Sequence, residues 1–360
     1  MPSQKLQSVQ YLRAIAALMV AYLHLCEQIE AYSPLLTGPS WIGVPRFDVG
    51  VDIFFVISGF IMVATSQRLG PKAFLWRRLI RIIPLYWIAT LTLVAAALVM
   101  PSLFKETRPN LLDTAKSLLF IAFHNTAQHG QIFPLLVPGW TLNLEMCFYA
   151  IFTVTLLAWI RPYQIWLTGI LFSIVLVVGL NLSDHNSLLA FYSQPRIFEF
   201  WIGMVIARVF VTTTTSMPAA MAYALIALGL VLRLPPLPNS LVNTTTYILG
   251  PALCVIGAIY AERRGAMPNL PFLELLGDAS YSIYLTHIFT EGVARTIWHR
   301  LPVGTGAAAG IAFAVFSLAS VIGIALLSYR YIEKPTLRWL MNLSARRQTS
   351  HSMAVNTPSG

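Results

Sequence analysis

The chain has 360 residues, of which 57% are hydrophobic and only 11% are charged. Soluble globular domains carry about 25% charged residues on average, and the mean hydropathy of +0.68 over the whole length requires a lipid environment. These values exclude an ordinary soluble enzyme and predict an all-α integral membrane protein. The net charge of +10 would suggest a nucleic-acid partner in a soluble protein. Here the basic residues cluster beside apolar runs, which is typical of membrane topology and predicts no nucleic-acid binding.

About ten apolar runs are expected to form transmembrane helices with cytoplasmic termini. They lie at residues 10–30, 48–66, 79–100, 138–160, 163–180, 196–212, 218–233, 243–261, 276–298 and 305–330. With both termini inside, the inner side carries about twice as many Lys and Arg residues as the outer side, as the positive-inside rule requires. We therefore predict one transmembrane domain at 1–340, followed by a polar, disordered cytoplasmic tail at 341–360. The shorter segment 111–123 is expected to be re-entrant or interfacial.

The three cysteines are Cys26, Cys147 and Cys254, and all lie within apolar runs without CxxC spacing. They predict neither a disulfide framework nor a metal site.

Several ionisable side chains fall inside the predicted spans. Each costs about 2.5 to 3.5 kcal/mol on insertion scales, and such residues usually mark pathways or sites. Arg13 and His24 are eleven residues apart. At 100° per residue they face the same side of a helix, about 16 Å apart along its axis. One helix face thus joins a cation near the inner surface to an imidazole deeper in the membrane.

Counting positions along the spans separates these groups by depth. Four acidic or imidazole groups fall in one outer layer, and His287 lies near the midplane. The outer layer contains His24, Asp52, Glu145 and Glu199, and the inner, basic layer contains Arg13, Arg77, Arg78 and Arg81. The arginines suit the phosphates of a cytosolic molecule. A histidine beside a carboxylate suits a general base for a hydroxyl that arrives from outside.

Each candidate also has a structural interpretation. Arginines at helix ends commonly anchor in lipid headgroups, and Glu145 can pair helices. The carboxylate of Asp52 can interact with the start of its helix. Arg196 and Glu199, three residues apart, can pair with each other. The polar stripe formed by Ser280, Tyr284 and His287 can serve inter-helix hydrogen bonding alone.

Seven segments, in this order, resemble the acyltransferase 3 family of membrane O-acyltransferases, in particular members that acylate exopolysaccharide or lipopolysaccharide sugars. They are LQSVQYLRAIAALMVAYLH (6–24), FDVGVDIFFVISGFIM (47–62), RRLIRIIPLYW (77–87), PGWTLNLEMCFY (138–149), PRIFEFWIGM (195–204), LGDASYSIYLTH (276–287) and YRYIEKP (329–335). The resemblance covers about residues 6–340.

The resemblance implies transfer of an acyl group, usually acetyl, from cytoplasmic acyl-CoA to a hydroxyl on the outer side of a bacterial inner membrane. It implies His24 as the catalytic group, which we expect Glu145 to assist. We expect the donor to bind Arg13, Arg77, Arg78 and Arg81. The candidate acceptor residues are Asp52, Arg196, Glu199, Ser280, Tyr284 and His287.

Acetyl-CoA is then a substrate, and no permanently bound cofactor or metal is expected. The expected acceptor is a polysaccharide or lipid-linked saccharide, with polysaccharide-synthesis machinery as a candidate partner. The alternative function is a secondary transporter or flippase for an anionic solute, which can use the same cationic entry and intramembrane carboxylates.

Overall fold

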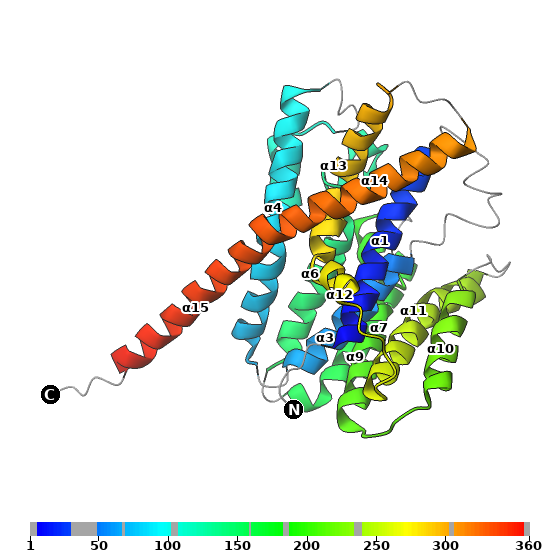
Figure 1. The fold of residues 1–360 in the computed structure, drawn as a ribbon. Helices are drawn as coiled ribbons and strands as arrows, with labels where there is room; N and C mark the ends of the chain where they lie inside the picture. Colours follow the sequence, from blue (N-terminus) through cyan, green and yellow to red (C-terminus); the bar gives the residue numbers. More distant parts are fainter. Residues whose placement is uncertain are drawn as a thin grey trace.

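The computed structural model describes residues 6–29, 49–66, 69–101, 107–157, 160–182, 187–233, 240–301 and 306–355. These segments are almost entirely helical (Figure 1). One short antiparallel hairpin pairs β1 (His124–Asn125) with β2 (Gln131–Ile132). The prediction of an all-α membrane protein is confirmed at this level.

A long helix occupies each of the predicted apolar runs. These helices are α1 (Gln7–Ile29), α3 (Val49–Ser66), α4 (Pro71–Val99), α6 (Gly139–Thr155), α7 (Gln164–Leu182), α9 (Ile197–Thr212), α10 (Ala219–Val231), α11 (Ser240–Arg263), α13 (Ser280–Trp298) and α14 (Ala307–Ser328). Within the described residues, 6 helical segments are long and apolar enough to cross a membrane. Ten crossings and cytoplasmic termini stay predictions.

The remaining elements lie between and beyond these helices. They are α5 (Leu111–Leu118), η2 (Thr126–Gln128), η3 (Arg161–Tyr163), α8 (Leu188–Tyr192), α12 (Pro271–Asp278), the π-helical turn η4 (Tyr329–Glu333) and α15 (Lys334–Val355). The predicted run 276–298 is broken at Ala279, so α12 and α13 are separate helices. The segment predicted as a polar tail falls largely on α15, whose backbone is helical to Val355 because neither glycine nor proline interrupts it after Pro335. The division of the chain at residue 340 stays a prediction.

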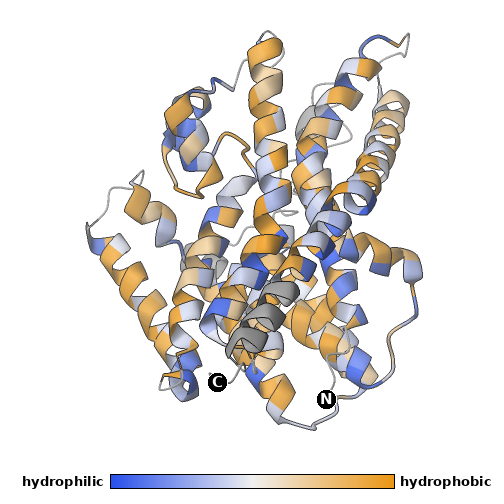
Figure 2. Cartoon of the chain, turned by 90° about the vertical axis from the view of Figure 1, so that its left-hand side faces the viewer, coloured by the Kyte–Doolittle hydropathy of each residue, from blue (hydrophilic) through white to orange (hydrophobic). Residues whose placement is uncertain are grey.

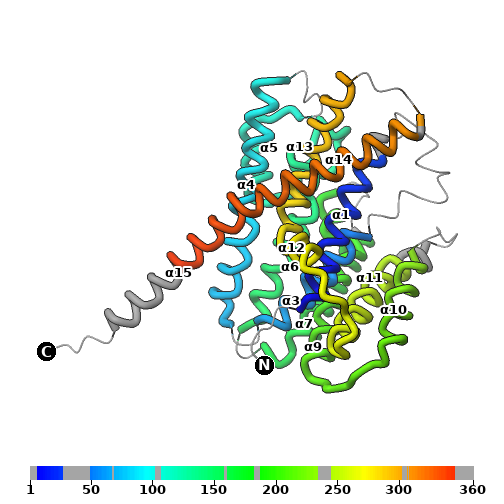
Figure 3. Tube along the Cα trace, viewed as in Figure 1, coloured from blue at the N-terminus to red at the C-terminus, as the bar shows by residue number. Residues whose placement is uncertain are grey.

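Helix α1 packs among α3, α11, α12, α13 and α14, which places its polar residues inside the bundle. Helices α10 and α11 form a hairpin at one side, and α14 and α15 follow one long line across the bundle in Figures 1 and 3. Hydrophobic residues lie along most of the helices in Figure 2, and many large apolar side chains are exposed, as expected for a protein surrounded by lipid.

The carboxylate of Glu262 fixes the beginning of α1. It accepts hydrogen bonds from the backbone nitrogens of Gln7 (2.9 Å) and Ser8 (2.8 Å) and from the hydroxyl of Ser8 (2.5 Å). The first backbone N–H groups of a helix lack partners within it and carry partial positive charge. A side chain of α11 therefore sets where α1 starts and joins the two helices.

Two glycines allow α3 and α9 to approach closely. A Cβ on Gly59 would lie 1.9 Å from the carbonyl oxygen of Phe200, and one on Gly203 would lie 2.0 Å from that of Val56. Small residues commonly permit such contact between membrane helices. This contact positions the face of α3 that lines the cavity described below.

We predict that Gly203→Ala destabilises the protein although alanine is the better helix former. Alanine normally stabilises a helix interior by about 1 kcal/mol relative to glycine, but here its methyl group would push α9 away from α3. Gly323→Ala on α14, where a Cβ meets nothing within 4 Å, is the matched control. The unfolding midpoint in detergent should fall for Gly203→Ala and should not fall for the control. Equal midpoints for the two variants would contradict the close contact.

Candidate functional site

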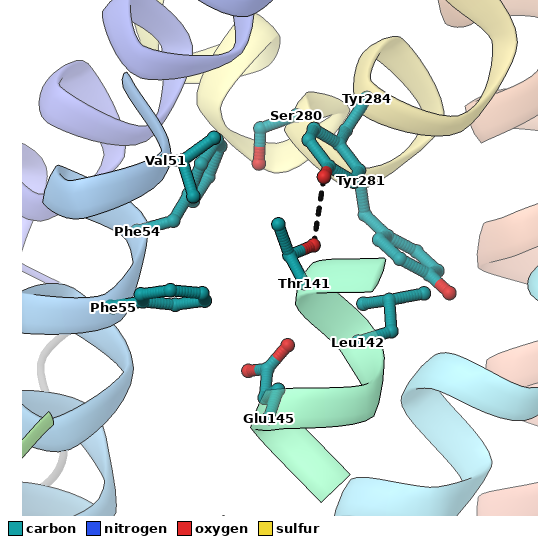
Figure 4. A pocket seen from close by; sticks show the side chains of 9 residues that line it. All are labelled: Val51, Phe54, Phe55, Thr141, Leu142, Glu145, Ser280, Tyr281 and Tyr284. Atoms are coloured by element: carbon teal, nitrogen blue, oxygen red, sulfur yellow. Dashed lines mark hydrogen bonds between the residues drawn. The ribbon is translucent and has the colours of Figure 1, made fainter. Parts of the chain in front are cut away.

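A cavity of about 80 Å³ lies between α3, α6 and α13 (Figure 4). Its size permits a few water molecules or a small substituent. Most of the lining is apolar or aromatic, with polar atoms contributed by Thr141, Glu145, Ser280 and the tyrosines. The lining residues are Val51, Phe54, Phe55, Thr141, Leu142, Glu145, Ser280, Tyr281 and Tyr284. An apolar pocket with a few convergent polar groups is typical of small-molecule sites.

Glu145 enters this cavity from α6, where Figure 4 shows its carboxylate one turn below Thr141. The Ser58 hydroxyl donates a hydrogen bond of 2.8 Å to its Oε1, and the Tyr149 hydroxyl donates another to the same atom. Two hydroxyl donors hold the carboxylate in place from α3 and from the next turn of α6. Ser58 was not predicted as a site residue, because the distance between α3 and α6 cannot be read from local spacing. Tyr149 was also missed, although it follows Glu145 by four residues on the same helix and this spacing makes the two side chains neighbours.

Tyr284 joins the cavity to the imidazole groups. Its hydroxyl bonds with Thr141 Oγ1 (2.7 Å) and donates to the carbonyl oxygen of Pro138 (2.8 Å). Its ring lies 6.1 Å from that of His287, and the His287 ring stacks on His24 with centroids 5.2 Å apart. The sequence placed His24 and His287 at neighbouring depths, and the structure brings them into contact.

Ser280 and His287 are fully buried polar residues of α13. Within the described residues, neither the Ser280 hydroxyl nor the ring nitrogens of His287 have a hydrogen-bond partner of good geometry. Buried polar groups are normally satisfied. A hydroxyl that lines the cavity without a partner is therefore available to a ligand.

Arg13 is buried in α1 and donates a hydrogen bond to Gln10. Its charge lies within electrostatic range of Arg81, Glu333 and Glu145. The Glu333 carboxylate accepts a hydrogen bond from Ser282 (2.6 Å). Glu333 is buried because the π-helical turn η4 directs its side chain inward.

The α4 arginines differ in exposure. Arg78 is half-buried, donates to Thr65 (3.0 Å) and lies over the Phe74 ring. Arg81 is half-buried and lies beside Glu333. Arg77 is exposed. Arg13, Arg78 and Arg81 therefore face the interior of the bundle together, whereas Arg77 faces outward.

Asp52 lies in a separate charge cluster. Its carboxylate is fully buried and forms ion pairs with Arg196 (3.4 Å) and Arg233 (3.0 Å). Arg233 also lies over the Tyr247 ring at 3.8 Å. The sequence singled out Asp52 and Arg196 but missed Arg233, because it lies at the end of a predicted span where arginine is common. Glu199, also predicted, is fully buried on α9.

Comparisons with known proteins match nearly the whole chain. The family model described as "Acyltransferase domain" matches residues 6–330. The chain belongs to the acyltransferase 3 family. This confirms the resemblance drawn from the seven segments, and it makes the chain an acyltransferase rather than the transporter considered above.

Three relatives of this acyltransferase illustrate the breadth of the family. Exopolysaccharide production protein ExoZ of Rhizobium meliloti is 38% identical over 80% of this chain and 89% of that protein. Acyltransferase MdmB of Streptomyces mycarofaciens is 24% identical over 93% and 92%. Peptidoglycan O-acetyltransferase OatA of Listeria monocytogenes is 26% identical over 91% of this chain and 55% of that protein. No solved structure matches the chain.

We predict that Asp52→Asn destabilises the acyltransferase by about 3 kcal/mol, because removing one partner of a buried ion pair leaves the other charge uncompensated. The unfolding midpoint in detergent measures this loss. Asp113→Asn, a half-buried carboxylate on the short helix α5, is the control and should leave the midpoint almost unchanged. A midpoint for Asp52→Asn as high as that of the control would show that Asp52 is not a structural link.

Proposed function

We propose that this acyltransferase moves an acyl group, most simply acetyl, from cytoplasmic acyl-CoA to a hydroxyl of an extracytoplasmic or lipid-linked polysaccharide. The observation that carries the proposal is the position of the cavity between α3, α6 and α13. Glu145 of its lining lies within electrostatic range of Arg13 and Arg78, and Tyr284 of its lining contacts His287. The cavity is therefore bordered by cations and by the paired imidazoles.

The cationic border suits the donor. The nucleotide end of acyl-CoA carries several phosphate charges, and guanidinium groups bind phosphate through paired, charge-assisted hydrogen bonds. We propose that Arg13, Arg78 and Arg81 hold these phosphates and that the neutral arm extends toward Glu145. Arg77 contributes only at the exposed edge of this phosphate-binding site, because its side chain is exposed.

The imidazole border suits proton removal. In the proposed reaction a ring nitrogen of His24 takes the proton of the acceptor hydroxyl while the hydroxyl oxygen attacks the thioester carbon. The carbon–sulfur bond breaks, the ester forms, and the CoA thiolate leaves and receives a proton. Glu145 stabilises the cationic imidazole through space. A route through an acyl-histidine intermediate uses the same residues.

The proposed acceptor site is argued from the polar residues of α13 and from the names of two relatives. We propose that Ser280, Tyr284 and His287 contact the acceptor, because Ser280 and Tyr284 line the cavity and His287 stacks on His24. In this scheme the other candidate acceptor residues, Asp52, Arg196 and Glu199, act farther from the reacting atoms than the residues of α13 do. The relatives ExoZ and OatA carry exopolysaccharide production and peptidoglycan O-acetylation in their names. These names support a saccharide acceptor. We also propose that the protein lies in the bacterial inner membrane, beside polysaccharide-synthesis machinery.

His24→Ala should abolish acyl transfer while leaving the protein in the membrane. The loss of a general base reduces rate by about two to four orders of magnitude. The measurement is the ester content of the exported polysaccharide by proton NMR, in a deletion strain complemented with each variant at equal membrane levels. His299→Ala, an exposed histidine at the end of α13, is the control and should restore the ester fully. Restoration by His24→Ala would show that this imidazole is structural.

Arg81→Ala should weaken the donor's binding by about tenfold in KM, equivalent to about 1.4 kcal/mol, with a much smaller change in kcat. CoA release from purified protein in liposomes measures both constants. Acyl-pantetheine, which lacks the nucleotide phosphates, is the matched donor and should be used equally well by wild type and variant. An equal loss with both donors would show that Arg81 does not bind phosphate.

A further inference from the structure

A second and larger cavity, about 500 Å³, lies between α4, α5, α6 and α8. We call it the α4–α6 groove, and it is lined by Leu79, Ile83, Trp87, Leu118, Leu119, Phe120, Asn143, Met146, Cys147 and Tyr192. Asn143 lies two residues from both Thr141 and Glu145. Two residues correspond to about 200° around a helix, so α6 presents its groove residues on the face opposite the cavity of Glu145. The groove is therefore separate from the proposed site of acyl transfer.

The mouth of the groove lies on an apolar outer surface of the protein. Trp87 is 41% exposed and Leu119 is 63% exposed. They belong to an apolar outer surface that continues along α4 at Ile88 and Leu91. In a membrane protein such a surface contacts lipid chains. A ligand of this groove can therefore enter sideways from the bilayer and must carry a hydrocarbon chain to match the walls.

One buried polar side chain of the groove, that of Asn143, lacks hydrogen-bond partners within the described residues. Asn143 is 1% exposed, and within the described residues neither its amide nitrogen nor its amide oxygen has a hydrogen-bond partner. An unpaired amide inside a low-dielectric interior is unfavourable by a few kcal/mol. Tyr192 adds a hydroxyl that accepts a hydrogen bond from the backbone of Ala122 at 3.3 Å. The apolar groove thus contains a buried donor and a buried acceptor without partners.

We propose that the α4–α6 groove binds a hydroxyl-bearing membrane lipid, with its hydrocarbon chain against α4 and α5 and its hydroxyl at Asn143. The two polar atoms of the Asn143 amide are attached to one carbon, so a single hydroxyl can accept from the nitrogen and donate to the oxygen. An all-carbon chain or an ester satisfies at most one of them. The N–H and C=O of a trans secondary amide point in opposite directions, so it cannot serve both. The binding does not depend on acyl transfer.

Cys147 supplies a reporter inside the groove. It is half-buried, whereas Cys26 and Cys254, the other cysteines of the chain, are buried. The protein in phosphatidylcholine nanodiscs would be reacted with N-ethylmaleimide, and the rate of labelling at Cys147 followed by peptide mass. The probes are oleyl alcohol and oleyl methyl ether, which share one chain and differ in the hydroxyl proton.

Oleyl alcohol should slow the labelling of Cys147 at a concentration about three- to tenfold lower than the ether does, as expected for one hydrogen-bonded group in a membrane interior. Equal protection by the two probes, or none, would overturn the proposal. Protection by acyl-CoA in place of the alcohol would assign the groove to the donor and would also overturn it.

Asn143→Leu keeps the size of the side chain and should abolish the preference for the alcohol. Asn181→Leu removes an exposed asparagine of α7 that bonds with its own helix at Val177, and it should retain the preference. A preference that survives in Asn143→Leu would contradict the role of this amide. If Asn143→Leu does not fold, the comparison of the two probes on the wild-type protein decides the proposal by itself.

Discussion

The carboxylate of Asp52 lies fully buried between the guanidinium groups of Arg196 and Arg233. A charge in a membrane interior is unfavourable unless it is paired, so this cluster binds α3, α9 and the end of α10 together. The same helix α3 approaches α9 through Gly59 and Gly203, and it contributes one wall of the small cavity. The ion pairs of Asp52 and the close contact between α3 and α9 therefore fix the position of α3, which forms one wall of the cavity that Glu145 lines. The geometry of the proposed reaction depends on both.

Helix α6 divides the interior into two environments. One face presents Thr141 and Glu145 to a small, largely apolar cavity that borders the arginines and the stacked imidazoles. The other face presents Asn143 and Cys147 to a wide apolar groove. A reacting thioester benefits from a confined space with few water molecules, whereas a lipid chain needs length and lateral access. In our account one helix separates the chemistry from the lipid, and each face carries the residues that its own ligand requires.

Long apolar runs predicted most of the helices, because hydropathy and length are local properties that the bilayer enforces. Helical phase placed Arg13 and His24 on one face of α1, and the family motifs pointed to Glu145. Pairing across the bundle could not be predicted. Arg233 meets Asp52, and Glu333 turns inward through a π-helical turn, by contacts between segments far apart in the sequence. The break at Ala279 was missed although Gly277, Asp278 and Ser280, which are poor helix formers, surround it in the sequence.

The most direct test of the central claim is an experimental structure of the protein with a non-hydrolysable thioether analogue of acetyl-CoA. The acyl end should lie in the cavity beside Glu145 and Tyr284. The phosphates should contact Arg13 and Arg81. An analogue whose acyl end lies away from this cavity, or whose phosphates contact neither arginine, would contradict the proposal that donor and acceptor meet between α3, α6 and α13.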